Sequence, residues 1–213
     1  MRKISGSPQP ARSEPGLFHP PLAVLVFLAG LMAASAAAAH DGTGLVGGFV
    51  SGFLHPLNGP DHMLAMVAVG LWGAILKRPL LVALPVDFPV MMAGGGVLGM
   101  TGIPMPPVEI GIGASVLVLG GAIAFGWKPR VWVAVLLVAV FAVFHGYAHG
   151  QELPSAADPV GYSVGFVFST GLLHLVGIAL GVIAERVGGL RVIKGLGGMI
   201  GLAGVWFLLK ALT

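Results

Sequence analysis

Side chains that could bind a metal gather in two short segments of this otherwise apolar chain. The first segment begins with His55 and ends with Asp61 and His62, with two Pro and one Gly between them. Imidazole and carboxylate groups are suitable ligands for Ni²⁺, Co²⁺, Cu²⁺ and Zn²⁺. We interpret these three residues as metal ligands. The alternative is that Asp61 caps a helix and pairs with a neighbouring His.

The second segment holds His145, His149 and Glu152. His145 and His149 are four residues apart and share one face of a helix, which is the spacing of a bidentate metal clamp. Glu152 lies one turn further along the same face. In a soluble protein such a His pair is more often part of the core, but an ionisable residue within a membrane span is functional by default. This segment therefore predicts a second set of ligands.

Three further residues are candidate ligands on weaker grounds. His174 is a single imidazole that either binds a metal or hydrogen-bonds a neighbouring helix. Asp87 lies between Pro85 and Pro89 with no Lys or Arg beside it, and an intramembrane carboxylate needs a proton, a cation or a His partner. His40 would add an α-amine and an imidazole if the chain were cleaved before it. The chain has no Cys, so any metal must use N and O ligands.

The composition is typical of an integral membrane protein. Of the 213 residues, 56% are hydrophobic and only 9% are charged, against about a quarter charged in soluble domains. The mean hydropathy is +0.97. The pI is near 9.6, but the Lys and Arg residues stand in short clusters between apolar stretches and form no basic face. We therefore expect an all-α protein in a lipid bilayer, with no nucleic-acid partner.

The first 39 residues have the pattern of a cleavable signal peptide. Basic residues precede an apolar run over 22–32, and three Ala at 37–39 form a small-residue cleavage site. Cleavage there would make His40 the mature N-terminus. The alternative is an uncleaved first helix, although the apolar run is shorter than the roughly 20 residues of a span.

Residues 40–213 are expected to form a single transmembrane domain with about six spans. The expected spans are 44–76, 80–101, 109–127, 131–150, 160–184 and 192–212. The first would be about 50 Å long as one helix, whereas the hydrocarbon core of a bilayer is about 30 Å thick. Pro56, Gly59 and Pro60 therefore predict that this helix is broken between 55 and 61, near the bilayer midplane.

The charges of the loops predict the orientation. If the signal peptide places the mature N-terminus outside, the basic clusters at 77–78, 128–130 and 186–194 all fall in cytoplasmic loops. We expect the bacterial inner membrane, with the N-terminus in the periplasm. Three spans followed by three would be inverted with respect to each other, and each half begins with a His-rich helix. This 3+3 arrangement is typical of inverted repeats in secondary transporters.

These residues and their spacing resemble the HupE/UreJ family. The family's His-x5-Asp-His motif falls on His55, Asp61 and His62. Its Phe-His-Gly-x-Ala-His-Gly-x-Glu motif falls on Phe144, His145, Gly146, Ala148, His149, Gly150 and Glu152. The signal peptide and the six later spans are also similar, so the resemblance covers nearly the whole chain. Pro60 and the longer polar N-terminus depart from the family pattern, and neither removes a candidate ligand.

The resemblance implies a membrane protein associated with hydrogenase and urease maturation, in a family regarded as permeases for nickel and sometimes cobalt. We expect a secondary permease rather than an enzyme, with no prosthetic group and with Ni²⁺, Co²⁺ or Zn²⁺ as the bound and transported ion. The expected outer ligands are Glu152 and His149, and the expected inner ligands are His55, Asp61, His62 and His145. A metallochaperone on the cytoplasmic side is an expected partner.

Two other functions use the same residues. An intramembrane zinc hydrolase would hold Zn²⁺ with three His and activate water with a carboxylate. A metal sensor or an assembly subunit would bind the ion without transporting it. The presence of two ligand sets favours passage of an ion, and the sequence does not decide the oligomeric state.

Overall fold

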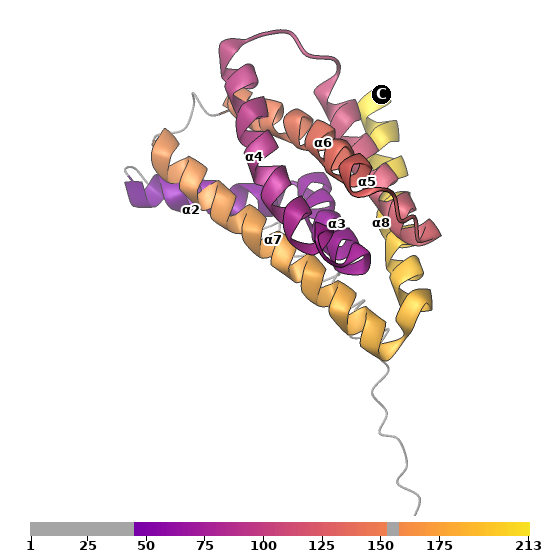
Figure 1. Cartoon of the computed structure of the whole chain (residues 1–213). Coiled ribbons are helices and arrows are strands. Elements are labelled where there is room, and N and C mark those ends of the chain that lie inside the picture. The colour runs from indigo at the N-terminus through magenta and orange to yellow at the C-terminus, as the bar shows by residue number, and fades with distance from the viewer. Residues whose placement is uncertain (1–44, 153–157) are drawn as a thin grey trace, which may run out of the picture.

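The computed structural model describes residues 45–152 and 158–213, and this part of the chain contains seven α-helices and no strand. The proposed signal peptide, His40 and the start of the first expected span lie outside the described residues. The helices are α2 (Leu45–Asn58), α3 (Pro60–Leu76), α4 (Leu80–Thr101), α5 (Val108–Phe125), α6 (Val131–Glu152), α7 (Pro159–Val187) and α8 (Gly189–Leu212) (Figure 1).

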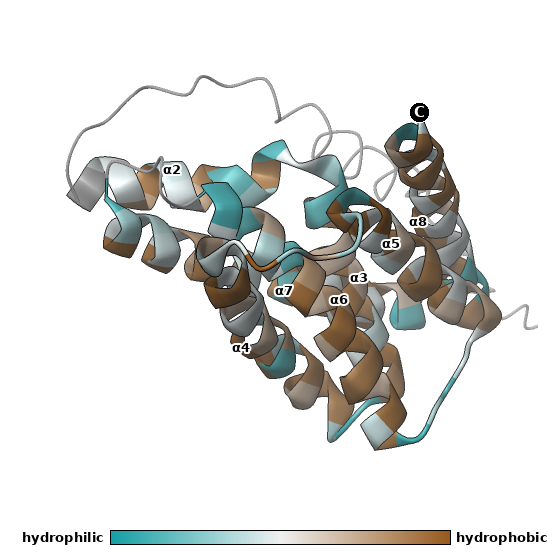
Figure 2. Ribbon diagram, turned by 90° about the horizontal axis from the view of Figure 1, so that it is seen from above, coloured by the Kyte–Doolittle hydropathy of each residue, from teal (hydrophilic) through white to brown (hydrophobic). Residues whose placement is uncertain are grey.

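Helices α4 to α8 are each long and apolar enough to cross a membrane, and α2 with α3 forms a sixth candidate span that is sharply bent. This confirms the expected all-α membrane class with five or six spans. Hydrophobic residues dominate the ribbons of α4, α5 and α6 (Figure 2). Large apolar side chains such as Val82, Val86 and Val90 of α4 are exposed on the outside of the bundle, as a lipid-facing surface requires.

The predicted break in the first span is confirmed at Gly59, where α2 and α3 meet at 83°. Gly59 has extended backbone angles (φ −97°, ψ 101°) because a Pro disfavours the helical conformation of the residue before it. Pro60 then occupies the first turn of α3, where its missing N–H costs no hydrogen bond. Pro56 does not contribute to the break, since α2 continues through it to Asn58.

Three helix pairings build the bundle: α4 packs along α6, α5 along α8, and α7 along both α2 and α3 (Figure 1). Helix α3 is enclosed, and every residue from Met63 to Ala74 is buried. In the expected 3+3 repeat, the spans α2–α3, α4 and α5 correspond in order to α6, α7 and α8. Under this correspondence the α4–α6 pairing is equivalent to the pairing of α7 with α2 and α3, and the α5–α8 pairing is equivalent to itself. This symmetry of contacts is what an inverted repeat would produce, and the repeat stays a prediction.

Small residues allow α4 and α6 to touch through their backbones. A Cβ on Gly146 of α6 would overlap the Met92 carbonyl of α4, and a Cβ on Gly95 would overlap the Val143 carbonyl. Close approach at Gly is a common way of packing helices in membranes. The contact fixes α6 against α4 next to His145 and His149, and so determines where the two imidazoles lie.

We predict that Gly146→Ala destabilises the protein by about 1–3 kcal/mol, because the new methyl group meets backbone that has no rotamer to change. Thermal unfolding of the purified protein in detergent measures the effect. The matched control is Gly94→Ala in α4, where a Cβ meets nothing within 4 Å. Equal unfolding temperatures for the two variants would contradict the proposed close contact.

Candidate metal centre

Three candidate ligands converge where the C-terminal ends of α2 and α6 meet. The Nε2 atom of His55 lies 3.0 Å from Glu152 Oε2, and Nδ1 of His149 lies 3.7 Å from the same oxygen. One donor atom from each of these residues lies within 4.8 Å of the other two. Among the described residues this is the one group of three or more His, Asp and Glu side chains close enough to hold a single metal ion.

From this group a row of imidazoles leads into the protein. The ring centroids of His55 and His149 are 4.8 Å apart, those of His149 and His62 are 4.7 Å apart, and those of His62 and His145 are 4.8 Å apart. The side chain of His55 is 33% exposed, those of His149 and His62 are 9% and 14% exposed, and His145 is fully buried. The row therefore connects the surface with the interior.

Hydrogen bonds fix the tautomers of the two inner imidazoles. His62 Nδ1 donates to Asp61 Oδ1 over 2.9 Å, and His145 Nδ1 donates to the Phe141 carbonyl over 2.9 Å. With the proton on Nδ1, each ring keeps its lone pair on Nε2. Both Nε2 atoms are buried and have no hydrogen-bond partner among the described residues. In metal sites, a ligating His typically donates its other ring N–H to a carboxylate or a backbone carbonyl, which fixes the orientation of the ring.

Asp61 has two roles at the start of α3. The same Oδ1 atom that accepts from the His62 ring also accepts from the His62 backbone N–H over 2.8 Å. The carboxylate therefore accepts from a backbone N–H of the first turn as well as from the imidazole, although the N-cap residue of α3 is Gly59 and not Asp61. Its position beside His62 also places a negative charge next to the inner imidazoles.

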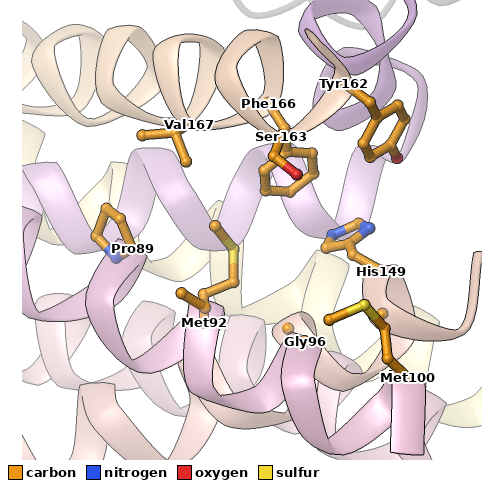
Figure 3. A pocket seen from close by; sticks show the side chains of 12 residues that line it. Pro89, Met92, Gly96, Met100, His149, Tyr162, Ser163, Phe166 and Val167 are labelled. Carbon is orange, nitrogen blue, oxygen red and sulfur yellow. The ribbon is translucent and has the colours of Figure 1, made fainter. Parts of the chain in front are cut away.

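Aromatic side chains of α7 enclose the row. The Phe166 ring lies 4.3 Å from that of His149, and the Tyr162 ring lies 5.6 Å from that of His55. A cavity of about 180 Å³ between α4, α6 and α7 has His149 in its wall. In Figure 3, Met92 and Met100 of α4 lie on one side of this cavity and Phe166 on the other. The walls are mainly apolar, and His149 is the one ionisable imidazole among the lining residues.

The structure changes the predicted grouping of the ligands. The sequence placed His55 in the inner set with Asp61 and His62, whereas the bend at Gly59 turns the end of α2 so that His55 lies beside Glu152 and His149. The outer set therefore consists of His55, His149 and Glu152. His62 lies inside it, in contact with the rings of both His149 and His145.

Asp87 and His174 lie apart from the row. Asp87 lines a separate cavity on the outside of α4, whose lining also includes Arg78, and within the described part of the chain this carboxylate forms no ion pair. His174 is separated from His145 by the Phe88 ring, whose centroid is 5.5 Å from one imidazole and 5.4 Å from the other. His174 faces the Pro85 carbonyl, which the missing N–H of Pro89 leaves without its helical partner.

Comparison with known proteins decides the family. Residues 27–207 match the family described as HupE / UreJ protein, a range that includes both His segments. The chain belongs to the HupE/UreJ family. A curated relative, Protein HupE of Rhizobium leguminosarum bv. viciae, is 42% identical over 177 residues, which cover 83% of this chain and 92% of that protein. No solved structure matches.

Sequence reasoning missed the aromatic residues of this HupE/UreJ site. Tyr162, Phe166 and Phe88 contact the imidazoles, but an aromatic side chain in an apolar helix resembles ordinary core. One available signal was the spacing of Tyr162 and Phe166, four residues apart on one face of α7. The metal-binding role of the His and carboxylate residues themselves is a proposal that the geometry supports.

We predict that Glu152→Gln weakens Ni²⁺ binding to the purified protein by at least about tenfold, because the amide removes the charge at the centre of the outer set. Isothermal titration in detergent measures the affinity. The control is Glu109→Gln, which removes an exposed carboxylate at the start of α5. If both variants bind like the unchanged protein, Glu152 is not a ligand.

Proposed function

We propose that this HupE/UreJ protein is a secondary permease for a divalent transition metal, with Ni²⁺ as the main ion and Co²⁺ as a second. The observation that carries the proposal is the continuous row from Glu152 through His55, His149 and His62 to His145. A single binding centre would need only three or four ligands. A row of donors from the partly exposed His55 to the fully buried His145 instead offers an ion successive places on a path inward.

Neighbouring imidazoles are close enough to pass an ion between them. Bonds from a transition metal to an imidazole nitrogen are about 2 Å long, so rings whose centroids lie under 5 Å apart can share one ion after small rotations. The ion would exchange one imidazole at a time and keep the next as a ligand. Transfer of this kind avoids a bare divalent ion in surroundings of low dielectric constant, which would be very costly.

The charges along the row suit a divalent cation. Glu152 stands at its exposed end and Asp61 beside its inner half, so two carboxylates offset the charge of the ion as it moves. His55 Nε2 donates to Glu152, and a metal ion that binds this nitrogen must replace the proton. In a neutral imidazole this proton can move to Nδ1 when the metal ion binds Nε2.

The arrangement supports a state that is open toward the Glu152 end. Glu152 is 55% exposed, whereas His145 is fully buried and the adjoining α3 is enclosed from Met63 to Ala74. Passage of an ion to the other side would need a rearrangement of the bundle. Alternation between two such states is the general mechanism of secondary transporters.

The proposed location is the bacterial inner membrane, with the Glu152 end outside. Lys77, Lys128 and Lys194 line one cavity at the opposite end of the bundle, in keeping with basic residues on the cytoplasmic side. In this orientation the ion enters at the acidic end and is released to the cytoplasm, where a metallochaperone would receive it for insertion into a metalloenzyme.

The geometry gives less support to an intramembrane hydrolase. His55, His149 and Glu152 could hold a catalytic zinc ion, which commonly has three protein ligands. Ser163 lines the cavity beside His149, but its hydroxyl donates to the Pro159 carbonyl over 2.8 Å. A hydrolase with its zinc ion at His55, His149 and Glu152 would also not require the imidazoles of His62 and His145. A sensor or assembly subunit would bind the ion at the same residues without flux.

The deciding experiment is uptake of radiolabelled Ni²⁺ into proteoliposomes. We expect saturable uptake by the unchanged protein and its loss in His62→Ala, because this substitution removes the link between His149 and His145. The control is His174→Asn, which alters a buried imidazole beyond Phe88 and should leave uptake within about twofold. Binding of Ni²⁺ without uptake by the unchanged protein would point to the sensor or the hydrolase.

A second prediction concerns the orienting role of Asp61. Asp61→Asn keeps the shape of the side chain but weakens the hydrogen bond that holds the proton on His62 Nδ1. Loss of such a supporting group typically costs about 10- to 100-fold in metal affinity or activity. We expect Ni²⁺ uptake to fall by this factor while the unfolding temperature changes little. Unchanged uptake would show that Asp61 only serves the helix start.

A further inference from the structure

We propose that the end of the bundle opposite to the imidazole row binds the headgroup of an anionic phospholipid. The site is a cavity of about 300 Å³ formed where three helix junctions meet, namely α3–α4, α5–α6 and α7–α8. Three lysines line the cavity: Lys77 from the α3–α4 junction, Lys128 from the α5–α6 junction, and Lys194 from the second turn of α8. Residues far apart in the sequence thus bring three ammonium groups to one hollow.

The charge of the cavity is strongly positive for its size. Glu185 is the one carboxylate in its lining, and it pairs with Lys77. Three ammonium groups and one carboxylate leave a net charge of +2. Lys128 and Lys194 form no ion pair with any residue in the described part of the chain. A phosphate group would match this charge, whereas a metal cation would be repelled.

The apolar part of the lining indicates that the anion carries a hydrocarbon chain. Phe125 and Leu190 line the cavity, and 86% of Phe125 and 57% of Leu190 are exposed. Trp127, the residue between Gly126 and Lys128 of the lining, is 44% exposed; its ring stacks on that of Trp72, and its carbonyl accepts from the Trp72 indole N–H. Exposed aromatic rings at the ends of membrane helices mark the level of the lipid headgroups.

A lipid explains both features at once. Its phosphate would lie among the lysines, and its acyl chains would run along the exposed apolar residues at the rim. Basic pockets between membrane helices at the cytoplasmic face are suited to anionic lipid headgroups. In the described residues, the Lys77–Glu185 ion pair joins the α3–α4 junction to the end of α7. A lipid bound in the cavity would connect all three junctions. We therefore expect it to stabilise the bundle.

Native mass spectrometry of the detergent-purified protein, without metal, tests the proposal. The probes are phosphatidylglycerol, phosphatidylcholine and inorganic phosphate. We expect tight binding of one phosphatidylglycerol and much weaker binding of phosphatidylcholine. Each lysine near an anionic lipid strengthens binding by about fivefold, so Lys128→Gln with Lys194→Gln should weaken it by roughly 30-fold.

The matched control is Arg130→Gln with Arg191→Gln. It removes the same charge from the same end of the bundle, from exposed residues that do not line the cavity. The control should retain the affinity of the unchanged protein. Equal weakening in both double variants would mean general attraction to a basic surface and would overturn the site. Inorganic phosphate that competes fully at similar concentration would show an anion site without lipid specificity, which also contradicts the proposal.

Discussion

The 83° bend at Gly59 is the constraint on which the arrangement of the imidazoles depends. It arises from two local effects, the extended backbone before Pro60 and the start of a new helix at that proline. A straight helix would place His55 and His62 two turns apart along one rod. The bend instead directs His55 to the end of α6 and keeps His62 in the enclosed helix α3. Both then contact His149 from different sides.

Backbone contacts at glycine give this arrangement its rigidity. Gly146 and Gly150 of α6 lie against the carbonyls of Met92 and Gly96 in α4, and Gly70 of α3 lies against the His174 carbonyl in α7. Lipid offers little hydrophobic drive for helices to associate, so close packing of this kind has to supply much of the attraction. The imidazoles are thus presented from helices whose separation cannot change without losing these contacts, which suits donors that must stay within reach of each other.

The sequence was sufficient for the helical class, the apolar spans and the place of the break, because each depends on local features: apolar length, Pro and Gly. It also identified the His and carboxylate residues that the fold brings together. It did not reveal that His55 joins Glu152, because this depends on the angle between α2 and α3. Nor did it reveal that Arg78 shares a cavity with Asp87, or that Phe88 separates His174 from His145. Those relations arise only from the packing of helices distant in sequence.

The position of Phe88 has a consequence for the energy balance of the membrane. Imidazoles in close succession can relay protons as readily as they bind metals, and a relay reaching across the bilayer would dissipate the proton gradient. The row ends at His145, and the Phe88 ring occupies the space before His174. A benzene ring has no group that can accept or donate a proton. If the row carries a metal ion as we propose, the Phe88 ring would interrupt a proton relay from His145 to His174 without removing any of the proposed ligands.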